Sequence, residues 1–318
     1  MRILYDSFSK TGGDKLLWKL DSSRLRILCY HGICADGLTK DPWIPQYFVG
    51  ASAFEKQLQY LGRNAQVLPL REAVDRLRDG SLPPRCVSLT FDDGYANNLE
   101  LAYPLLRKYG MPATIFLSST YMESGDFFPF LKLKLIQLDG GVDLAKAPLA
   151  DYKSATLDEV NRTAAPWWPE VRARLSDAQC RTLRPLSVEE VKGADAGLID
   201  FGPHSHTHCI FKNETPERRR QEIRTSIRKV NEWTSRPVHL FSYPNGQRGD
   251  FGEPDKQVLC AEGIQAAVTG ICGANNGRSE LLELKRYPVA LYHDDAGFCA
   301  EVTGFRTALL AASGRRAS

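Results

Sequence analysis

The sequence predicts an α/β fold built on a mainly parallel sheet or barrel. Short apolar runs rich in β-forming residues alternate with segments of helical periodicity, which is the pattern of repeated β-α units. About seven such apolar runs follow one another along the 318 residues, and this number fits a (β/α) barrel. The composition, 43% hydrophobic and 25% charged, is that of a globular chain and excludes a disordered or fibrous protein.

The elements of the first part of the chain are marked by local signals. We expect strands at 25–30, 86–91 and 113–117 and helices at 51–63, 71–78 and 96–109. Gly110 is suited to end the last of these helices, because glycine accepts a left-handed backbone. Pro104 lies inside the same helical pattern and predicts a kink or a split there.

The alternation breaks at about 121–186, where aromatic residues, prolines and a weakly periodic charged stretch predict an insertion packed against the core. We expect strands at 198–201, 238–242, 265–269 and 284–291 and helices at 187–196, 216–234, 254–262 and 297–311. The chain is therefore divided into an N-terminal extension, 1–24, and a single domain, 25–318, which contains the insertion.

Charge and cysteine usage bear on partners and compartment. The net charge of +3 is too small to indicate a nucleic-acid surface. The basic stretch at 212–229 is interpreted as a solvated helix face, with contact to an anionic membrane surface as a lesser alternative. The eight cysteines are scattered without a CxxC pair, as expected of thiols in a reducing compartment. Charged residues interrupt 1–20, where a signal peptide needs an apolar region, so we expect a cytoplasmic protein, either free or peripherally membrane-associated.

Three polar segments stand just after predicted strands, where the active sites of α/β folds form. The first is Thr90-Phe91-Asp92-Asp93-Gly94. Adjacent carboxylates repel each other and need a cation or a proton, and Gly94 allows a tight turn that aims both inward. One interpretation is a carboxylate on a metal beside a carboxylate acting as a base. The alternative is a polar turn in which Asp93 caps the next helix.

The second segment, 202–208, holds three of the six histidines. His204 and His208 are spaced i, i+4, which can bring two imidazoles to one ion on a helical turn. His206 would point away from that face and is assigned a supporting or surface role. The cluster predicts a metal site.

The third segment runs over 241–247, FSYPNGQ. An apolar strand ends there in a turn with proline, asparagine and glycine. Such a turn can expose backbone N–H groups as an oxyanion hole, and a plain turn is the alternative.

Together the three segments resemble the polysaccharide deacetylases, also called the NodB-homology family or family 4 of the carbohydrate esterases. The family's first motif, T-F-D-D-G, is present without change. Its second, H-[ST]-x-x-H, matches 204–208, and the F-x-Y-P-x-G form of its third matches 241–246. The resemblance runs from about 26 to 289 and is weakest in the insertion. It implies a distorted (β/α)7 barrel of the NodB-homology type. It also implies metal-dependent removal of N-acetyl groups from amino sugars of a glycan or glycan precursor.

Carried over residue by residue, the resemblance implies that Asp93, His204 and His208 hold one divalent ion. It implies that Asp92 is the catalytic base and that Ser205 holds the histidine loop by hydrogen bonding. Two imidazoles and a carboxylate suit zinc, and cobalt, nickel and manganese also suit such a set. A cation so held polarises water and the acetamide carbonyl.

The third motif shows both a match and a departure. Tyr243 and Asn245 are expected at the substrate, with the backbone N–H of Asn245 at the oxyanion. The arginine that orients the base in many members is replaced by Ser242. Arg286, on another predicted strand, is the candidate substitute, and a surface arginine is the alternative. The family's tryptophan-containing fourth motif is not recognisable.

The leaving amine needs a proton from a general acid, and two histidines are candidates. His31 ends the first predicted strand, and His293 follows the last. Members that deacetylate poly-N-acetylglucosamine resemble this chain in the Tyr-Pro third motif, and they place the acid histidine ahead of T-F-D-D-G. We therefore assign His31. Asp294 and Asp295 are typical of a helix cap, which would leave His293 in a surface loop.

Two rival functions stay open. One is a metal-independent hydrolase of non-sugar C–N bonds from the allantoinase-like branch, against which the intact Asp-His-His set argues. The other is a non-catalytic carbohydrate-binding barrel, against which the base Asp92 argues. The expected partner is an N-acetylated sugar, either lipid-linked or part of an oligosaccharide, and no nucleic acid is expected.

Overall fold

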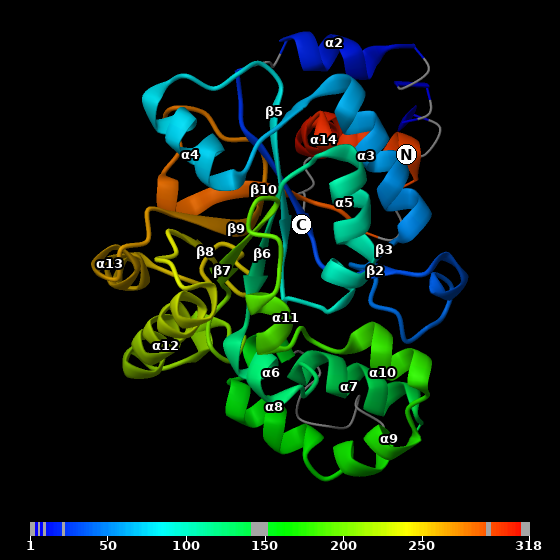
Figure 1. Ribbon diagram of the computed structural model, residues 1–318, viewed down its shortest axis with the longest axis vertical. Helices are drawn as coiled ribbons and strands as arrows, with labels where there is room; N and C mark the ends of the chain where they lie inside the picture. Colours follow the sequence, from blue (N-terminus) through cyan, green and yellow to red (C-terminus); the bar gives the residue numbers. More distant parts are fainter. Residues whose placement is uncertain are drawn as a thin grey trace.

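The computed structural model describes residues 4–5, 7–8, 11–20, 23–140, 152–290 and 294–312. In this described part of the chain, seven parallel strands form one sheet that curls into a nearly closed barrel (Figure 1). They are β1 (Arg26–Tyr30), β5 (Cys86–Phe91), β6 (Ala113–Leu117), β7 (Ile199–Pro203), β8 (Leu240–Ser242), β9 (Ala266–Cys272) and β10 (Leu284–Pro288). Neighbours pair in the order β7-β6-β5-β1-β10-β9-β8, so the strands follow around the barrel in chain order. The α/β barrel that the sequence predicts is confirmed.

The seam of the barrel lies between β7 and β8. A Cβ added to Gly202 in β7 would meet the carbonyl oxygen of Leu240 in β8 at 3.0 Å, so the two backbones lie close together. Just past β7, Nδ1 of His204 donates to the carbonyl oxygen of Ser242 at 2.8 Å. A candidate site residue therefore bridges the seam at the end where the strands finish.

Helices cover the outside of the barrel and build the insertion. They are α2 (Gly13–Leu20), α3 (Ala51–Asn64), α4 (Leu70–Asp79), α5 (Tyr103–Tyr109), α6 (Ser119–Ser124), α7 (Pro129–Leu138), α8 (Leu157–Ala164), α9 (Trp168–Arg174), α10 (Asp177–Leu183), α11 (Val188–Lys192), α12 (Pro216–Thr234), α13 (Glu253–Ala261), α14 (Asp295–Val302) and α15 (Phe305–Ala312). The short strands β2 (Ile33–Cys34) and β3 (Val49–Gly50) pair with each other, and β4 (Gln66–Val67) pairs with β5. Within the described ranges, no helix is both long enough and apolar enough to cross a bilayer.

Two expected helices are divided in the structure. The helix expected at 96–109 begins as a π-helical turn, η2 (Asn98–Ala102), and continues as α5, with Pro104 in the first turn of α5. The predicted split is confirmed, because proline has no N–H for the preceding turn. The closing helix expected at 297–311 is two helices, α14 and α15. Gly304 lies between them with φ of 78°, a left-handed conformation that interrupts the helix.

The insertion is helical and lies beyond the end of the barrel where α7, α8, α9 and α10 gather at the bottom of Figure 1. Leu131 and Val160 join its apolar side to the main core, so the expected packing is confirmed. The insertion returns to the barrel beside the first motif, where the Leu186 N–H donates to the Gly94 carbonyl at 2.8 Å.

The N-terminal extension packs on the opposite end of the barrel, with α2 at the top of Figure 1. Trp18 is buried, and its indole N–H donates to the hydroxyl of Tyr60 on α3 at 3.0 Å. The guanidinium of Arg26, at the start of β1, lies 4.6 Å from the centre of the Trp18 ring. This helix is therefore anchored far from the end at which the candidate site residues gather.

Candidate metal centre and active site

Asp92 and Asp93 follow β5 in a tight turn, and both side chains are buried. The turn is left-handed, with φ of 72° at Asp93 and 76° at Gly94. A side chain at Gly94 would be strained and would meet Cδ2 of Leu117 at 2.6 Å. The Asp93 carboxylate faces the histidines after β7, so the alternative in which it caps the next helix is wrong.

His204 and His208 meet at the Asp93 carboxylate, although not on the helical turn that their spacing suggests. The segment after β7 is an irregular loop in which Ser205 and His208 have φ of 57° and 59°. The loop brings the two imidazole rings to a centroid distance of 4.9 Å. Nε2 of His208 lies 3.1 Å from Asp93 Oδ1, and Nε2 of His204 lies 3.7 Å from the same atom.

Two other residues of this loop have different surroundings. His206 turns away from the cluster as expected, and its Nδ1 lies 2.8 Å from the hydroxyl of Ser119 on α6. The hydrogen bond expected of Ser205 is absent, since its buried Oγ has no partner among the described residues. The loop is held instead by Ser118, whose hydroxyl donates to the His204 carbonyl at 2.8 Å.

The protonation of these groups favours a cation between them. Burial lowers the pKa of His204 to about 4, so its imidazole is neutral at pH 7. Its Nδ1 proton is committed to the Ser242 carbonyl, and therefore Nε2 presents a lone pair toward Asp93. Asp93 Oδ1 is itself buried without a hydrogen bond of good geometry. Lone pairs facing one another in a buried site need a cation, so Asp93, His204 and His208 fit a divalent metal ion.

A second set of possible ligands lies beside the first but does not fit a cation. Atoms of Cys29, His31 and Asp92 lie within 4.8 Å of one another. Both carboxylate oxygens of Asp92, however, already accept from Arg286, at 2.8 and 2.6 Å. A metal ion there would meet a buried guanidinium at close range, and like charges repel strongly in such a site.

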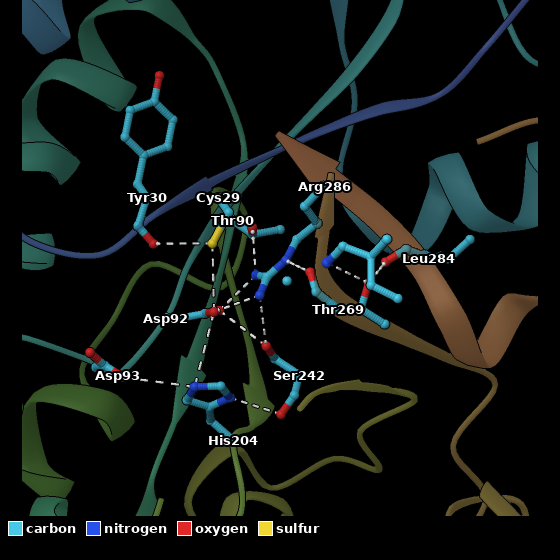
Figure 2. Close-up of polar contacts among 12 residues, drawn as sticks. Cys29, Tyr30, Thr90, Asp92, Asp93, His204, Ser242, Thr269, Leu284 and Arg286 are labelled. Carbon is cyan, nitrogen blue, oxygen red and sulfur yellow. Dashed lines mark hydrogen bonds and ion pairs between the residues drawn. The ribbon is translucent and has the colours of Figure 1, made fainter. Parts of the chain in front are cut away.

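Arg286 extends from β10 into the barrel and is buried, so the surface alternative is wrong. Figure 2 shows Asp92 between this guanidinium and the ring of His204. The arginine also donates to the Thr269 carbonyl at 2.8 Å and to the hydroxyl of Ser242 at 3.2 Å. Burial is the largest single influence on the pKa of Asp92 and acts to raise it. The charge and hydrogen bonds of Arg286, together with His204 and His31, outweigh burial, and the pKa lies below its usual value. Asp92 is therefore a carboxylate at neutral pH.

Sequence reasoning did not predict several side-chain contacts around Asp92 and Arg286. Ser242 donates to Asp92 Oδ1 at 3.2 Å, and the thiol of Cys29 donates to Oδ2 at 3.6 Å. Thr90 accepts from Arg286 at 3.2 Å. Thr90 and Ser242 lie within the motifs, and their place at a strand end was the signal that could have identified them.

His31 lies at the end of β1 and faces the same cavity as Asp92. Its Nδ1 is buried without a hydrogen-bond partner in the described chain. Burial lowers its pKa, although the two aspartates act in the opposite direction. The ring of Tyr47 packs against it at a centroid distance of 4.8 Å. The other candidate acid, His293, lies outside the described residues.

One part of the third motif is buried in the core, and the other part lines the cavity. Tyr243 does not reach the cavity, because its ring is buried against Phe251 at 4.0 Å and its N–H donates to Val268. The expectation that Tyr243 contacts substrate is therefore wrong. Asn245 does line the cavity, with φ of 56°, and its backbone N–H donates to no acceptor in the described chain. Its side chain is held by Asp250 at 2.5 Å.

The metal-ligating set, Asp92, Arg286, His31 and Asn245 line one cavity of about 370 Å³. Barrel residues form its polar side, including Asp92, Asp93 and Asn245. The insertion supplies much of its apolar side through residues such as Phe130 and Leu157. The metal-ligating set, the Asp92–Arg286 pair and His31 thus share one cavity.

The comparison with known families agrees with this geometry. The family model described as polysaccharide deacetylase matches residues 79–253, more than half of the chain. The chain belongs to the polysaccharide deacetylase family. Both aspartates and all three loop histidines lie inside the matched segment of this polysaccharide deacetylase chain, whereas His31 and Arg286 lie outside it.

Curated relatives of this family are similar over part of the chain. The poly-β-1,6-N-acetyl-D-glucosamine N-deacetylase of Staphylococcus epidermidis (strain ATCC 35984) is 34% identical over 116 residues, which are 36% of this chain and 39% of the relative. The chain therefore matches less than half of that relative's length. Solved structures share the fold. A Streptococcus pyogenes deacetylase, PplD, aligns over 88% of this chain and 99% of its own at 18% identity, with a TM-score of 0.61. IcaB from Ammonifex degensii aligns over 89% and 98% at 19% identity, with a TM-score of 0.59.

Proposed function

We propose that this protein is a metal-dependent hydrolase that removes N-acetyl groups from amino sugars of a glycan or glycan precursor. The observation that supports this most directly is the grouping of Asp93, His204 and His208 next to the buried Asp92–Arg286 pair. A carbohydrate-binding barrel has no use for a carboxylate held at 2.6 Å by a guanidinium beside a metal site. A hydrolase needs that carboxylate as a base.

We assign each group a role from its position. Asp93, His204 and His208 hold the ion, which when bound supplies Lewis-acid polarisation of water and of the amide carbonyl. Asp92 is charged at neutral pH and takes the proton of the attacking water. Its two oxygens stay oriented because Arg286 holds both of them.

The remaining steps concern the leaving nitrogen and the developing oxyanion. His31 lies in the same cavity with a buried ring nitrogen that makes no hydrogen bond in the described chain, and we assign it the proton delivery to the amine. Asn245 lines the same cavity with a left-handed backbone, and its N–H has no acceptor in the described chain, so we assign this N–H to the oxyanion.

We also propose which ion the site holds and which substrates to test first. We propose zinc, which sites with two imidazoles and a carboxylate commonly hold. Cobalt, nickel and manganese are the alternatives. The name of the Staphylococcus epidermidis relative points to poly-β-1,6-N-acetylglucosamine as the first substrate to test. A lipid-linked or short-oligosaccharide precursor is the second.

We further propose a role in carbohydrate metabolism within a reducing compartment, the cytoplasm, with peripheral membrane contact at most. The support for this is the sequence, in which the eight cysteines are scattered without a CxxC pair. Nucleic acid is not part of the proposal, because cations of the 212–229 stretch pair with carboxylates. Arg219 contacts Asp255 at 3.1 Å, and Arg224 contacts Glu262 at 2.8 Å.

The test is acetate release from β-1,6-linked N-acetylglucosamine oligomers by protein loaded with each candidate ion. Acetate should appear with the ion, stop with a chelator, and be nearly absent with Asp92→Asn. Release that survives full chelation would favour a metal-independent amidohydrolase. Tight sugar binding without acetate in any metal form would favour a binding barrel.

A further inference from the structure

The helical insertion closes one side of the cavity with a row of aromatic rings. The ring of Tyr47, from the chain between β2 and β3, lies 4.8 Å from His31 and 6.4 Å from Phe130 of α7. Phe130 in turn lies 5.1 Å from His208 and stacks at 6.3 Å and 27° on Tyr152 of η3 (Tyr152–Ser154). We call Tyr47, Phe130 and Tyr152 the aromatic wall. It runs from the candidate acid to a candidate metal ligand.

The wall and the opposite side of the cavity differ in chemistry. All three wall residues line the cavity, and Leu157 and Val160 of α8 extend the apolar surface behind them. The barrel side presents the carboxylates, Asn245 and the metal-ligating set instead. A pyranose ring has the same division, with C–H groups on its faces and hydroxyl and acetamido groups around its edge. One sugar ring between the two sides would meet apolar atoms on its face and polar groups at its edge.

The wall also limits how a glycan can lie. A sugar in the interior of a polymer needs two exits from the site, one for each neighbouring sugar. The ring contact between Tyr47 and Phe130 joins the loop before β3 to the insertion, so a glycan chain passing between these two segments would have to separate the two rings. A cavity of about 370 Å³ is near the small end of the roughly 300–1,000 Å³ range of ligand pockets.

We infer that the aromatic wall makes this a site for the N-acetylated sugar at the end of a glycan or on a small carrier. Phe130 and Tyr152 are its specificity-determining residues. This inference rests on the proposed function, because it names the substrate class of the same site.

Tyr152 offers the cleaner test of the two residues. It is 39% exposed, so its replacement removes little of the core. Its ring contact is with Phe130, whereas Phe130 also packs against His208 and its replacement would disturb a metal ligand as well. Trp167, 43% exposed on the same insertion and not part of the cavity lining, is the matched control.

The experiment uses the metal-loaded 318-residue protein with β-1,6-linked N-acetylglucosamine oligomers of one to about six units and the long polymer. Mass spectrometry of the products locates each freed amine. We expect deacetylation at a terminal sugar only, with kcat/KM constant beyond the shortest oligomers. Tyr152→Ala should raise KM about tenfold with kcat and metal content unchanged. Tyr152→Phe, which restores the ring that Tyr152→Ala removes, should bring KM back toward that of the unmodified protein, and Trp167→Ala should behave as the unmodified protein.

Deacetylation at interior sugars, or an unchanged KM in Tyr152→Ala, would overturn the inference while leaving the deacetylase proposal intact. If no oligomer releases acetate, the proposed function fails, and saturation-transfer NMR with the β-1,6-linked disaccharide then tests the wall alone. If the disaccharide binds the unmodified protein and Trp167→Ala but not Tyr152→Ala, the role of the aromatic wall is supported. Equal binding by both variants, or none by the unmodified protein, would overturn it.

Discussion

Replacing Arg286 with Met tests the electrostatic arrangement on which the proposed base depends. The guanidinium and the Asp92 carboxylate are both nearly inaccessible to solvent and meet through two charge-assisted bonds of 2.8 and 2.6 Å. Methionine keeps much of the side-chain volume and removes the charge. Breaking a buried pair by removing one partner costs about 3–5 kcal/mol, since it leaves an uncompensated buried charge. We expect a loss of that size at pH 7 in the free energy of unfolding.

The pH dependence of this loss has a definite sign. With Arg286 present, the folded pKa of Asp92 lies below its unfolded value of about 3.9. The pair therefore contributes fully above about pH 4 and loses its contribution as the pH falls through the folded pKa. In Arg286→Met the largest lowering influence on Asp92 is gone, and we expect burial, which is the largest influence of all, to hold its folded pKa above the unfolded value. The penalty is then absent below about pH 4 and grows as the pH rises, so the substitution should cost less at pH 5 than at pH 7.

Urea unfolding of metal-free protein, followed by the fluorescence of its five tryptophans, measures these differences. The double variant Asp92→Asn/Arg286→Met should recover most of the lost stability, with a coupling energy of about 3 kcal/mol in the cycle. Arg278→Met, at an exposed arginine, is the control and should change stability by less than about 0.5 kcal/mol. Additive single effects, or a cost that does not vary between pH 7 and pH 5, would refute the reasoning.

Three further predictions concern the assigned roles. Asp92→Asn should keep the ion and lose roughly 10²–10⁴ in rate, whereas Asp93→Asn should lose the ion; equal loss of metal in both would mean that the roles are wrongly divided. Elemental analysis should find about one divalent ion per chain in the unmodified protein and little in His204→Ala, and full occupancy in that variant would remove it from the ligand set. His31→Ala should keep the ion and lose most activity while His293→Ala changes little, and the reverse result would transfer the acid role to His293.

Elements were predicted well wherever a local signal bounds them. The strand at 86–91 and the helix at 216–234 have the predicted bounds, because proline and aspartate clusters delimit the strand and a proline begins the helix. The helices of the insertion were not resolved from the sequence, since their weak periodicity gives no face to assign. The break at Gly304 was missed because an isolated glycine inside a helical pattern is often tolerated.

Only the site residues that belong to the three sequence motifs or stand on predicted strands or at their ends could be predicted. The spacing of His204 and His208 indicated a shared ion, yet it gave the wrong backbone, because two left-handed residues replace the helical turn. Tyr47 and Phe130 had no signal in the sequence at all. Their place beside the metal-ligating set depends on how the insertion packs over the barrel, and that packing is a tertiary property.

The position of Arg286 shows why a barrel can satisfy one chemical requirement from different strands. Asp92 lies between His204 and the Arg286 guanidinium, and the family that this chain resembles often has its arginine on the strand of the third motif. Here that place holds Ser242, and the arginine comes from β10, two strands farther around the barrel. It reaches Asp92 because side chains that point into a parallel barrel converge on the same axis. The carbonyl of Thr269, on the intervening β9, accepts its Nε–H and holds its direction. The requirement is therefore for a guanidinium at one point in space, and any strand whose inward side chains reach that point can supply it.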